Sequence, residues 1–248
     1  MKISIITATK NSCKTLEQSL LSYIMQDYPD KELIIVDGYS TDCTLDVIKK
    51  YRQHIDVLTF EPKSGIYPAL NLGIKVASGD VIGFLHSDDF FIDNKVLTDI
   101  AKMFQQGYDV VYGDVVYINS KGKIWRYWKA GKFSAKQLIF GWMPPHTTFF
   151  VKKDLYQKYG LYREDLLIAA DYEMILRILT KNVRVGYVDR LLTVMRAGGK
   201  SNRSLSNILL KTKEDFYSAK INGMPALITV LAKNIRKINQ FFPLKLRN

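Results

Sequence analysis

Cysteine is scarce in this sequence, with Cys13 and Cys43 the two examples among 248 residues. Neither has a second cysteine or a histidine at the spacing of metal ligands, which excludes a zinc site built on that pattern. The sequence therefore predicts two reduced thiols in a cytoplasmic protein.

Long apolar runs are also missing. No stretch approaches eighteen consecutive apolar residues, so nothing in the sequence needs to span a membrane. The opening MKISIITATKNS has too short an apolar run for a signal peptide and lacks a small-residue cleavage site. Low-complexity tracts and repeats are absent and 47% of residues are hydrophobic, which predicts a folded chain with a sizeable core.

Acidic residues are few for the number of basic ones, and the net charge is +12. Between Arg203 and Asn248, nine basic residues face two acidic ones. Such a segment attracts polyanions, so a nucleic-acid-binding protein is a hypothesis from another functional class. Because the charge gathers in the tail and not beside an aromatic stacking platform, and because no binding motif is recognised, we expect no nucleic-acid partner.

The first half alternates short apolar runs with helical spacing. This pattern predicts an α/β fold whose mostly parallel sheet is flanked by helices. The expected strands are 2–8, 32–36, 55–60 and 80–85, and the expected helices are 14–26, one beginning near Thr41 or Asp42, 66–77 and 94–105.

After residue 107 the pattern becomes mixed. Expected strands are 108–112, 115–119, 124–128 and 146–151, and expected helices are 153–159 and 171–180. We interpret 1–202 as one domain whose two halves, 1–106 and 107–202, form the two walls of a cleft. Residues 203–248 are expected to form a basic, helical tail.

Polar clusters follow each strand of the first half, at the end where parallel sheets bind ligands. They are 9–12, 37–42, 61–65 and 87–89. The adjacent carboxylates of Asp88 and Asp89 repel each other, which leaves three interpretations: a helix cap, a turn, or ligands of Mg²⁺ or Mn²⁺.

Five motifs occur in an order that resembles one family. They are TATKNS, IIVDGYSTDCT, EPKSGIYPALNLGIKVASGDVIGFLHSDD, AADYEMILRI and AGGKSN, and together they cover roughly residues 2–205. The chain resembles a family-2 glycosyltransferase, which implies the GT-A fold and an inverting transfer of a sugar from a nucleotide-diphosphate sugar, with a UDP-sugar expected.

The resemblance implies that 1–106 is the nucleotide-sugar-binding half and 107–202 the acceptor-side half, and it implies a role for each matching residue. Asp171 is the implied general base, although an acidic residue at a helix start also suits the helix dipole. Asp89 is the implied ligand of Mg²⁺ or Mn²⁺. The nucleotide is expected at Asp37, Thr7, Thr9, Asn11 and Asp88, with Glu61 and Gly65 in a donor-site loop, His146 on the acceptor side, and Gly198, Gly199, Arg196 or Lys200 near the diphosphate.

Three positions depart from the family pattern, namely His86, Pro68 and Ala170, where related sequences often carry acids or, at 86, Asn. These departures keep open a catalytically impaired relative that binds a sugar nucleotide. A nucleotidyltransferase is a further alternative. The Gln-x-x-Arg-Trp motif of processive synthases is absent, which favours one sugar added per encounter.

The tail carries an apolar stripe with helical spacing, formed by Leu227, Leu231, Ile235, Ile238 and Phe242. Lys233, Arg236 and Lys237 fall largely on other faces, as in helices that lie on anionic membranes. Two interpretations remain: the stripe docks on the domain, or it holds the enzyme peripherally on the cytoplasmic face of a membrane, near a saccharide or lipid-linked acceptor.

Overall fold

The computed structural model describes residues 1–63, 65–196 and 205–238. Gly198, Gly199, Lys200 and Phe242, which carry expectations above, lie outside these ranges.

The strands of the described residues join in a single mixed sheet with the order β3-β2-β1-β4-β8-β6-β9-β5, and β7 pairs with β6. The first four are parallel to one another, and β6 is parallel to β9. The strands are β1 (Ile3–Thr9), β2 (Lys31–Asp37), β3 (Val57–Phe60), β4 (Val81–Phe84), β5 (Phe90–Phe91), β6 (Val110–Ile118), β7 (Ile124–Trp128), β8 (Phe150–Lys152) and β9 (Val185–Arg196).

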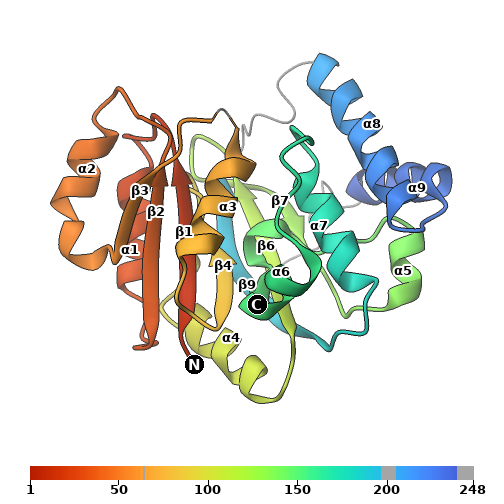
Figure 1. Ribbon diagram of the computed structural model, residues 1–248, viewed down its shortest axis with the longest axis horizontal. Coiled ribbons are helices and arrows are strands. Elements are labelled where there is room, and N and C mark those ends of the chain that lie inside the picture. Colours follow the sequence, from red (N-terminus) through yellow and green to blue (C-terminus); the bar gives the residue numbers. More distant parts are fainter. Residues whose placement is uncertain (64, 197–204, 239–248) are drawn as a thin grey trace.

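Helices cover both faces of this sheet, and α3 and α7 lie in front of it in Figure 1. The helices are α1 (Leu16–Ile24), α2 (Thr44–Lys50), α3 (Ile66–Val76), α4 (Val96–Gln105), α5 (Ala135–Ile139), α6 (Lys153–Tyr159), α7 (Ala170–Leu179), α8 (Leu205–Ile221) and α9 (Ala226–Ile238), with 3₁₀ turns η1 (Arg52–His54) and η2 (His146–Thr148).

The central strands are buried on both faces because successive side chains point to opposite sides. In β2, Ile34 and Val36 belong to the core cluster that includes residues of α3 and α7, whereas Leu33 and Ile35 belong to the cluster that includes residues of α1 and α4. The apolar runs of the first half therefore predicted the strands correctly, and the α/β fold is confirmed.

Two expectations for the second half were wrong, and one strand was missed. The segments 108–112 and 115–119 are one strand, β6, whose pairing with β9 shifts around Gly113 and Asp114. His146 does not begin a strand but opens the 3₁₀ turn η2. The long strand β9 was not predicted at all, since Asp189 and Arg190 interrupt its apolar pattern.

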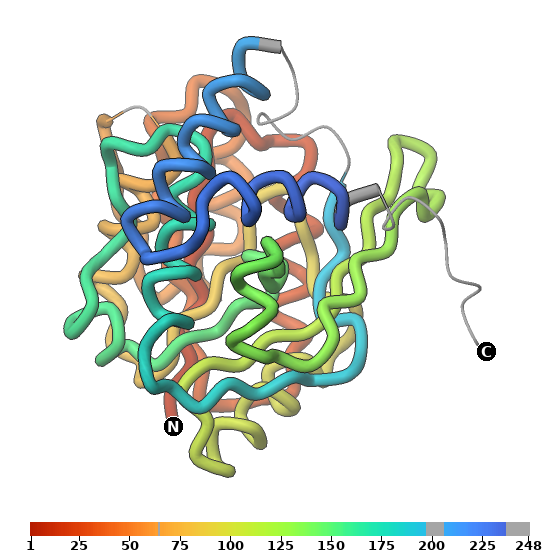
Figure 2. The backbone as a smooth tube through the Cα atoms, turned by 90° about the vertical axis from the view of Figure 1, so that its right-hand side faces the viewer, coloured from red at the N-terminus to blue at the C-terminus, as the bar shows by residue number. Residues whose placement is uncertain are grey.

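The C-terminal helices pack against the second half of the chain. Helix α9 crosses α5 in Figure 2, where the Thr229 hydroxyl donates a hydrogen bond to the Ile139 carbonyl at 2.8 Å. Gly141 permits this approach, because a Cβ there would lie 2.4 Å from the Lys233 backbone nitrogen and its φ is +67°. Within the described ranges, no helix is long and apolar enough to cross a membrane.

Candidate active site

A cavity of about 1270 Å³ opens beyond the carboxyl ends of β1 and β4. Most of the predicted site residues line it: Thr9, Asn11, Glu61, Gly65, Asp88, Asp89, His146 and Asp171. Thr7 and Asp37 do not, although Asp37 directly precedes the lining residue Gly38. The volume exceeds that of ordinary small-ligand pockets and suits a large ligand or two ligands side by side.

The loop after β1 is held to the loop after β2. The Asn11 backbone nitrogen donates to the Ser40 hydroxyl at 2.9 Å, and the Thr41 nitrogen donates to Asn11 Oδ1 at 2.8 Å. The buried Asp37 accepts from both the Ser40 nitrogen and hydroxyl, at 2.8 and 2.6 Å. Asp37 therefore shapes this wall through Ser40, and its contact with a nucleotide base stays a prediction.

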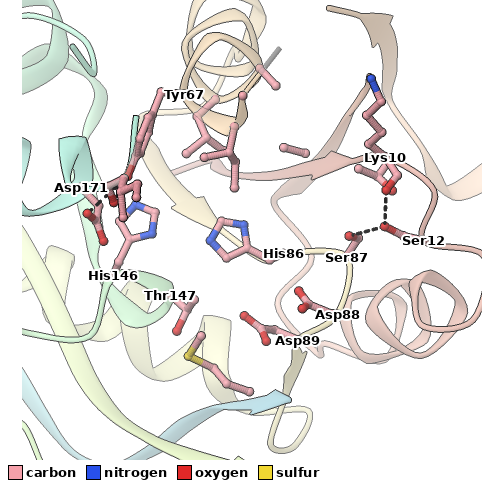
Figure 3. Close-up of a pocket in the computed structure, with 18 of the residues that line it drawn as sticks. Lys10, Ser12, Tyr67, His86, Ser87, Asp88, Asp89, His146, Thr147 and Asp171 are labelled. Carbon is pink, nitrogen blue, oxygen red and sulfur yellow. Dashed lines mark hydrogen bonds between the residues drawn. The ribbon is translucent and has the colours of Figure 1, made fainter. Parts of the chain in front are cut away.

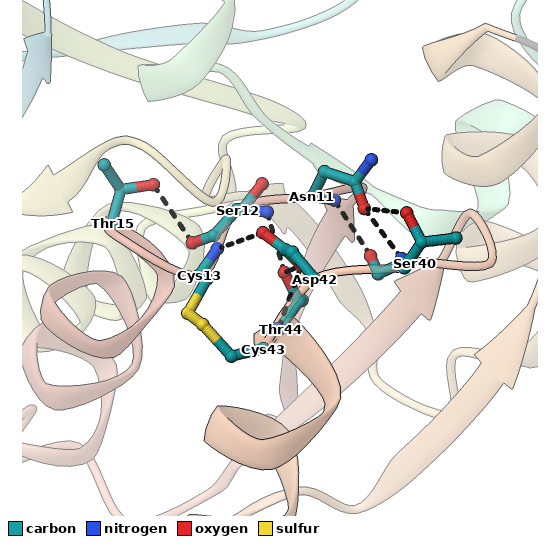
Figure 4. The surroundings of a disulfide bond; sticks show 9 residues. Asn11, Ser12, Cys13, Thr15, Ser40, Asp42, Cys43 and Thr44 are labelled. Atoms are coloured by element: carbon teal, nitrogen blue, oxygen red, sulfur yellow. Dashed lines mark hydrogen bonds between the residues drawn. A yellow bond between two sulfur atoms is a disulfide. The ribbon is translucent and has the colours of Figure 1, made fainter.

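A disulfide joins the same two loops, between Cys13 and Cys43 (Figure 4). The prediction of two reduced thiols was therefore wrong. Because β1 and β2 are neighbours and parallel, the loops that follow them meet, and the two Cα atoms lie 5.2 Å apart. Sequence spacing does not reveal this strand order, and the cysteines no longer support a reducing compartment.

Asp88 and Asp89 differ in their surroundings. Asp88 is exposed, whereas Asp89 is buried and its Oδ2 has no hydrogen-bond partner among the described residues. Burial, and next the charge of Asp88, raise the pKa of Asp89 well above its usual range. A cation bound here would offset both the cost of burying the Asp89 charge and its repulsion by Asp88.

No group of three or more His, Cys, Asp or Glu side chains able to hold a metal occurs in the described part of the chain. Mg²⁺ and Mn²⁺ need fewer protein ligands, because they keep waters and bind substrate phosphates. The two adjacent carboxylates and the unpartnered Asp89 oxygen fit such an ion, with the substrate supplying the remaining ligands.

His86 lies between the Asp88–Asp89 pair and Asp171 in Figure 3. Its Nδ1 is buried without a hydrogen-bond partner in the described ranges, and burial lowers its pKa. His86 and His146 stack with ring centroids 5.6 Å apart, and burial lowers the pKa of His146 to about 4. Two neutral imidazoles therefore line the cavity between the acidic groups.

Asp171 lies in the first turn of α7, across the cavity from Asp88 and Asp89 (Figure 3). Its Oδ1 accepts a hydrogen bond from the Tyr172 backbone nitrogen at 2.8 Å. The Tyr67 hydroxyl lies 3.4 Å from the same oxygen and donates its shorter hydrogen bond, at 2.7 Å, to the Ile168 carbonyl. Burial, and next the charge of Asp171, raise the pKa of Tyr67, which therefore stays a hydrogen-bond donor.

His146 belongs to the same wall as Asp171. Its Nε2 lies 2.7 Å from the Tyr162 hydroxyl, and its ring stacks on Phe84. These contacts fix the imidazole in place beside Asp171, as Figure 3 shows.

Sequence reasoning missed several lining residues. Tyr67, Tyr117, Arg126, Trp128, Lys211 and Lys233 all line the cavity. Arg126 lies between the rings of Tyr117 and Trp128, at 4.5 and 5.3 Å from their centroids. For Arg126 and Trp128, the spacing of two along β7 is the sequence signal that could have placed them on one face of the sheet.

A sequence model described as "Glycosyl transferase family 2" matches residues 4–168. The chain is 29% identical over 212 residues to a "PGL/p-HBAD biosynthesis glycosyltransferase" of Mycobacterium bovis (strain BCG / Pasteur 1173P2), with 84% of this chain and 80% of the relative covered. It is 35% identical over 138 residues to the Escherichia coli "UDP-Glc:alpha-D-GlcNAc-diphosphoundecaprenol beta-1,3-glucosyltransferase WfgD", with 55% of this chain and 52% of that one covered.

Two solved structures share the fold. S. aureus TarS 1-349 in complex with UDP-GlcNAc aligns with a TM-score of 0.72 at 20% identity, over 100% of this chain and 76% of that one. The mannosyltransferase PcManGT from Pyrobaculum calidifontis, in complex with GDP-Man and Mn²⁺, aligns with a TM-score of 0.61 at 16% identity, over 95% and 64%. At these identities the likeness shows the fold alone.

Proposed function

The chain belongs to glycosyl transferase family 2, and on that premise we propose that it transfers one sugar from a UDP-sugar to a hydroxyl of a saccharide or lipid-linked acceptor, with inversion at the anomeric carbon. The observation that carries the proposal is the position of Asp171, which faces Asp88 and Asp89 across a single cavity (Figure 3).

The proposed reaction is a single displacement. Asp171 takes the proton of the acceptor hydroxyl while that oxygen attacks the anomeric carbon. The bond between the anomeric carbon and the diphosphate oxygen breaks, and its electron pair leaves with the nucleoside diphosphate. The hydrogen bond that the Tyr172 backbone nitrogen donates to Asp171 holds the carboxylate in position for this step.

On the donor side, Asp88 and Asp89 would hold Mg²⁺ or Mn²⁺ together with the donor phosphates. The ion would offset the negative charge that gathers on the leaving diphosphate. Asp88 is also proposed to face the ribose, and Thr9 and Asn11 the nucleoside. Thr7 and Asp37, which do not line the cavity, are proposed to support the residues that bind the nucleotide, and Asp37 does so through its hydrogen bonds from Ser40.

A membrane surface is proposed to hold the acceptor near the cavity. The E. coli relative is named for a diphosphoundecaprenol acceptor. In this chain the outer face of α9 exposes Leu227, Leu231 and Ile235 beside Arg236. An apolar face with basic neighbours is typical of helices that lie on anionic bilayers.

The proposal is tested by thermal unfolding in the presence of UDP-sugars, with and without Mn²⁺. A donor at a hundred times its dissociation constant adds about 2.7 kcal/mol, which raises the midpoint by roughly 5–10 °C in a chain of this size. Asp89→Asn is expected to lose the part of this shift that requires Mn²⁺. Asp46→Asn, an exposed carboxylate outside the cavity, serves as the matched control.

Failure of every UDP-sugar to stabilise the protein would overturn the donor assignment. The product of turnover separates the remaining alternatives: a glycosyltransferase releases UDP, a nucleotidyltransferase releases pyrophosphate, and an impaired relative binds the donor and releases neither.

A further inference from the structure

Helices α8 and α9 bring two lysines into the cavity wall. Lys211 from α8 and Lys233 from α9 both line the cavity, and both reach Asp215, with Nζ to carboxylate distances of 2.7 and 2.6 Å. The side chains of Lys233 and Asp215 are 4% and 3% exposed, and that of Lys211 is 21% exposed. Two ammonium groups thus share one buried carboxylate.

Two side chains of this region make further contacts, one from the neighbouring Glu214 and one from Lys233 itself. Glu214, next to Asp215, accepts hydrogen bonds from the backbone nitrogens of Leu167, Ile168 and Ala169, all at 2.8 Å. The Lys233 ammonium lies 3.2 Å from the centroid of the Tyr172 ring.

The charge of Asp171 also acts on Lys211, beyond that of Asp215. Burial lowers the pKa of Lys211, but Asp215 and then Asp171 outweigh that effect and raise it. When Asp171 takes the acceptor proton it becomes neutral, and Lys211 loses the favourable charge of Asp171. An anionic group on the acceptor would restore a negative charge near the two ammonium groups.

The lysines lie on the acceptor side of the site. They come from helices that pack beyond α7 in Figure 1, whereas Asp88 and Asp89 follow β4. A donor diphosphate held near Asp89 therefore leaves the lysine pair for another anion on the far side of Asp171.

We propose that Lys211 and Lys233 bind the phosphate or diphosphate of a phosphorylated acceptor, whose sugar hydroxyl then faces Asp171. This inference rests on the proposed function. Ammonium groups bind phosphate oxygens through charge-assisted hydrogen bonds, and a group attached to the accepting sugar lies within one sugar ring of the reacting hydroxyl. A lipid-linked glycosyl diphosphate and a soluble sugar phosphate share this chemistry.

The first experiment measures binding of inorganic pyrophosphate by calorimetry to enzyme saturated with UDP, which occupies the donor site. We expect binding to the wild type and a roughly 10- to 100-fold weaker affinity for Lys211→Met, the loss expected for one charge-assisted hydrogen bond. Lys211→Met leaves the Lys233–Asp215 pair intact, so the fold is retained. Lys213→Met, an exposed lysine on the same helix and outside the cavity, is the matched control.

The second experiment compares acceptors in transfer assays: an alkyl glycoside, the same sugar as an alkyl glycosyl diphosphate, and the sugar 1-phosphate. Lys211→Met should raise KM for the phosphorylated acceptors by a similar factor and raise KM for the neutral glycoside by much less, whereas Lys213→Met should leave both KM values and the affinity for UDP unchanged. A preference for the alkyl glycosyl diphosphate over the sugar 1-phosphate would identify a lipid-linked acceptor. The reverse preference would identify a soluble sugar phosphate as the acceptor.

Two outcomes would overturn the inference: pyrophosphate that binds the UDP-saturated wild type and Lys211→Met equally or not at all, or an equal effect of Lys211→Met on neutral and phosphorylated acceptors. Failure of the proposed function is distinct, because then the wild type transfers sugar to none of the three acceptors while pyrophosphate binding still reports on the lysines.

Discussion

Glu32 lies at the amino-terminal edge of the sheet, away from the cavity, and is almost fully buried. It accepts hydrogen bonds from the Ser78 nitrogen and hydroxyl, both at 2.6 Å, and forms an ion pair with Lys2 at 2.9 Å. Burial alone would raise the pKa of Glu32, but the hydrogen bonds from Ser4, Ser78 and Lys2 outweigh it and lower the pKa to about 2.

A carboxylate with a lowered pKa in the folded state stabilises the protein above its unfolded pKa, near 4.5, and loses that contribution as the pH falls toward 2. Glu32→Gln should therefore lower the free energy of unfolding by roughly 2–3 kcal/mol at pH 7. Urea unfolding at pH 7 and pH 3 measures this, and the difference should be less than half as large at pH 3. Asp154→Asn, an exposed carboxylate, is the control; an undiminished difference at pH 3 would contradict the account.

At the same scale, the sequence predicted which side chains gather at the cavity because parallel strands end at one edge of a sheet. Asp89, Asp88 and Thr9 follow from that rule. The rule does not predict that Asp37 lies outside the cavity lining. Its carboxylate accepts hydrogen bonds from Ser40, a contact that depends on the turn after β2. The cysteine pairing depends on strand order, which spacing alone does not give.

Among the elements, α8 supports the start of α7. The Glu214 carboxylate accepts hydrogen bonds from the backbone nitrogens of the three residues that precede Ala170, and so holds the turn that carries Asp171. A carboxylate at a helix amino terminus stabilises it through hydrogen bonds and the helix dipole. Glu214 is thus a positioning residue for Asp171.

Glu214→Ala is expected to lower kcat roughly 10-fold, since small displacements of a catalytic group are costly. The affinity for UDP, measured by calorimetry, should stay unchanged because the residues proposed to bind the donor lie on other elements. Asp165→Ala removes an exposed carboxylate from the loop before α7 and is the control. An unchanged kcat, or an equal loss of UDP affinity, would show that Glu214 does not act through Asp171.

The elements of the first half were predictable and those of the second half were less so. Strands β1, β2 and β4 are buried on both faces and read as continuous apolar runs. The apolar pattern of β6 is interrupted by Gly113 and Asp114, and the buried Asp114 accepts hydrogen bonds from the Tyr127 and Tyr187 hydroxyls and the Ala130 nitrogen. Tertiary contacts of this kind, which no local pattern contains, join the two predicted segments into one strand.

Across the whole molecule, the face of α9 that packs inward is not the apolar stripe. Thr229, Val230 and Lys233 are buried, whereas Leu227, Leu231 and Ile235 are 66%, 56% and 64% exposed. The docking interpretation of the stripe therefore fails for these three residues, and the membrane interpretation stays a prediction.

Replacing Leu227, Leu231 and Ile235 together by serine should reduce co-sedimentation with anionic vesicles, because each buried apolar side chain contributes about 1.5–3 kcal/mol. Leu21→Ser with Met25→Ser changes two exposed apolar residues, one in α1 and one directly after it, and is the matched control. Binding should also weaken in high salt and with neutral vesicles. Equal sedimentation of the triple variant and the wild type would remove the membrane role.

The central claim is that one cavity holds a UDP-sugar at Asp88 and Asp89 and a general base at Asp171. The measurement that tests it most directly follows UDP release and UDP affinity together in Asp171→Asn. The account predicts that the affinity stays within about twofold of the wild type while turnover falls at least 100-fold, the usual scale of general-base catalysis. Turnover retained at the wild-type rate would contradict it and place the base elsewhere.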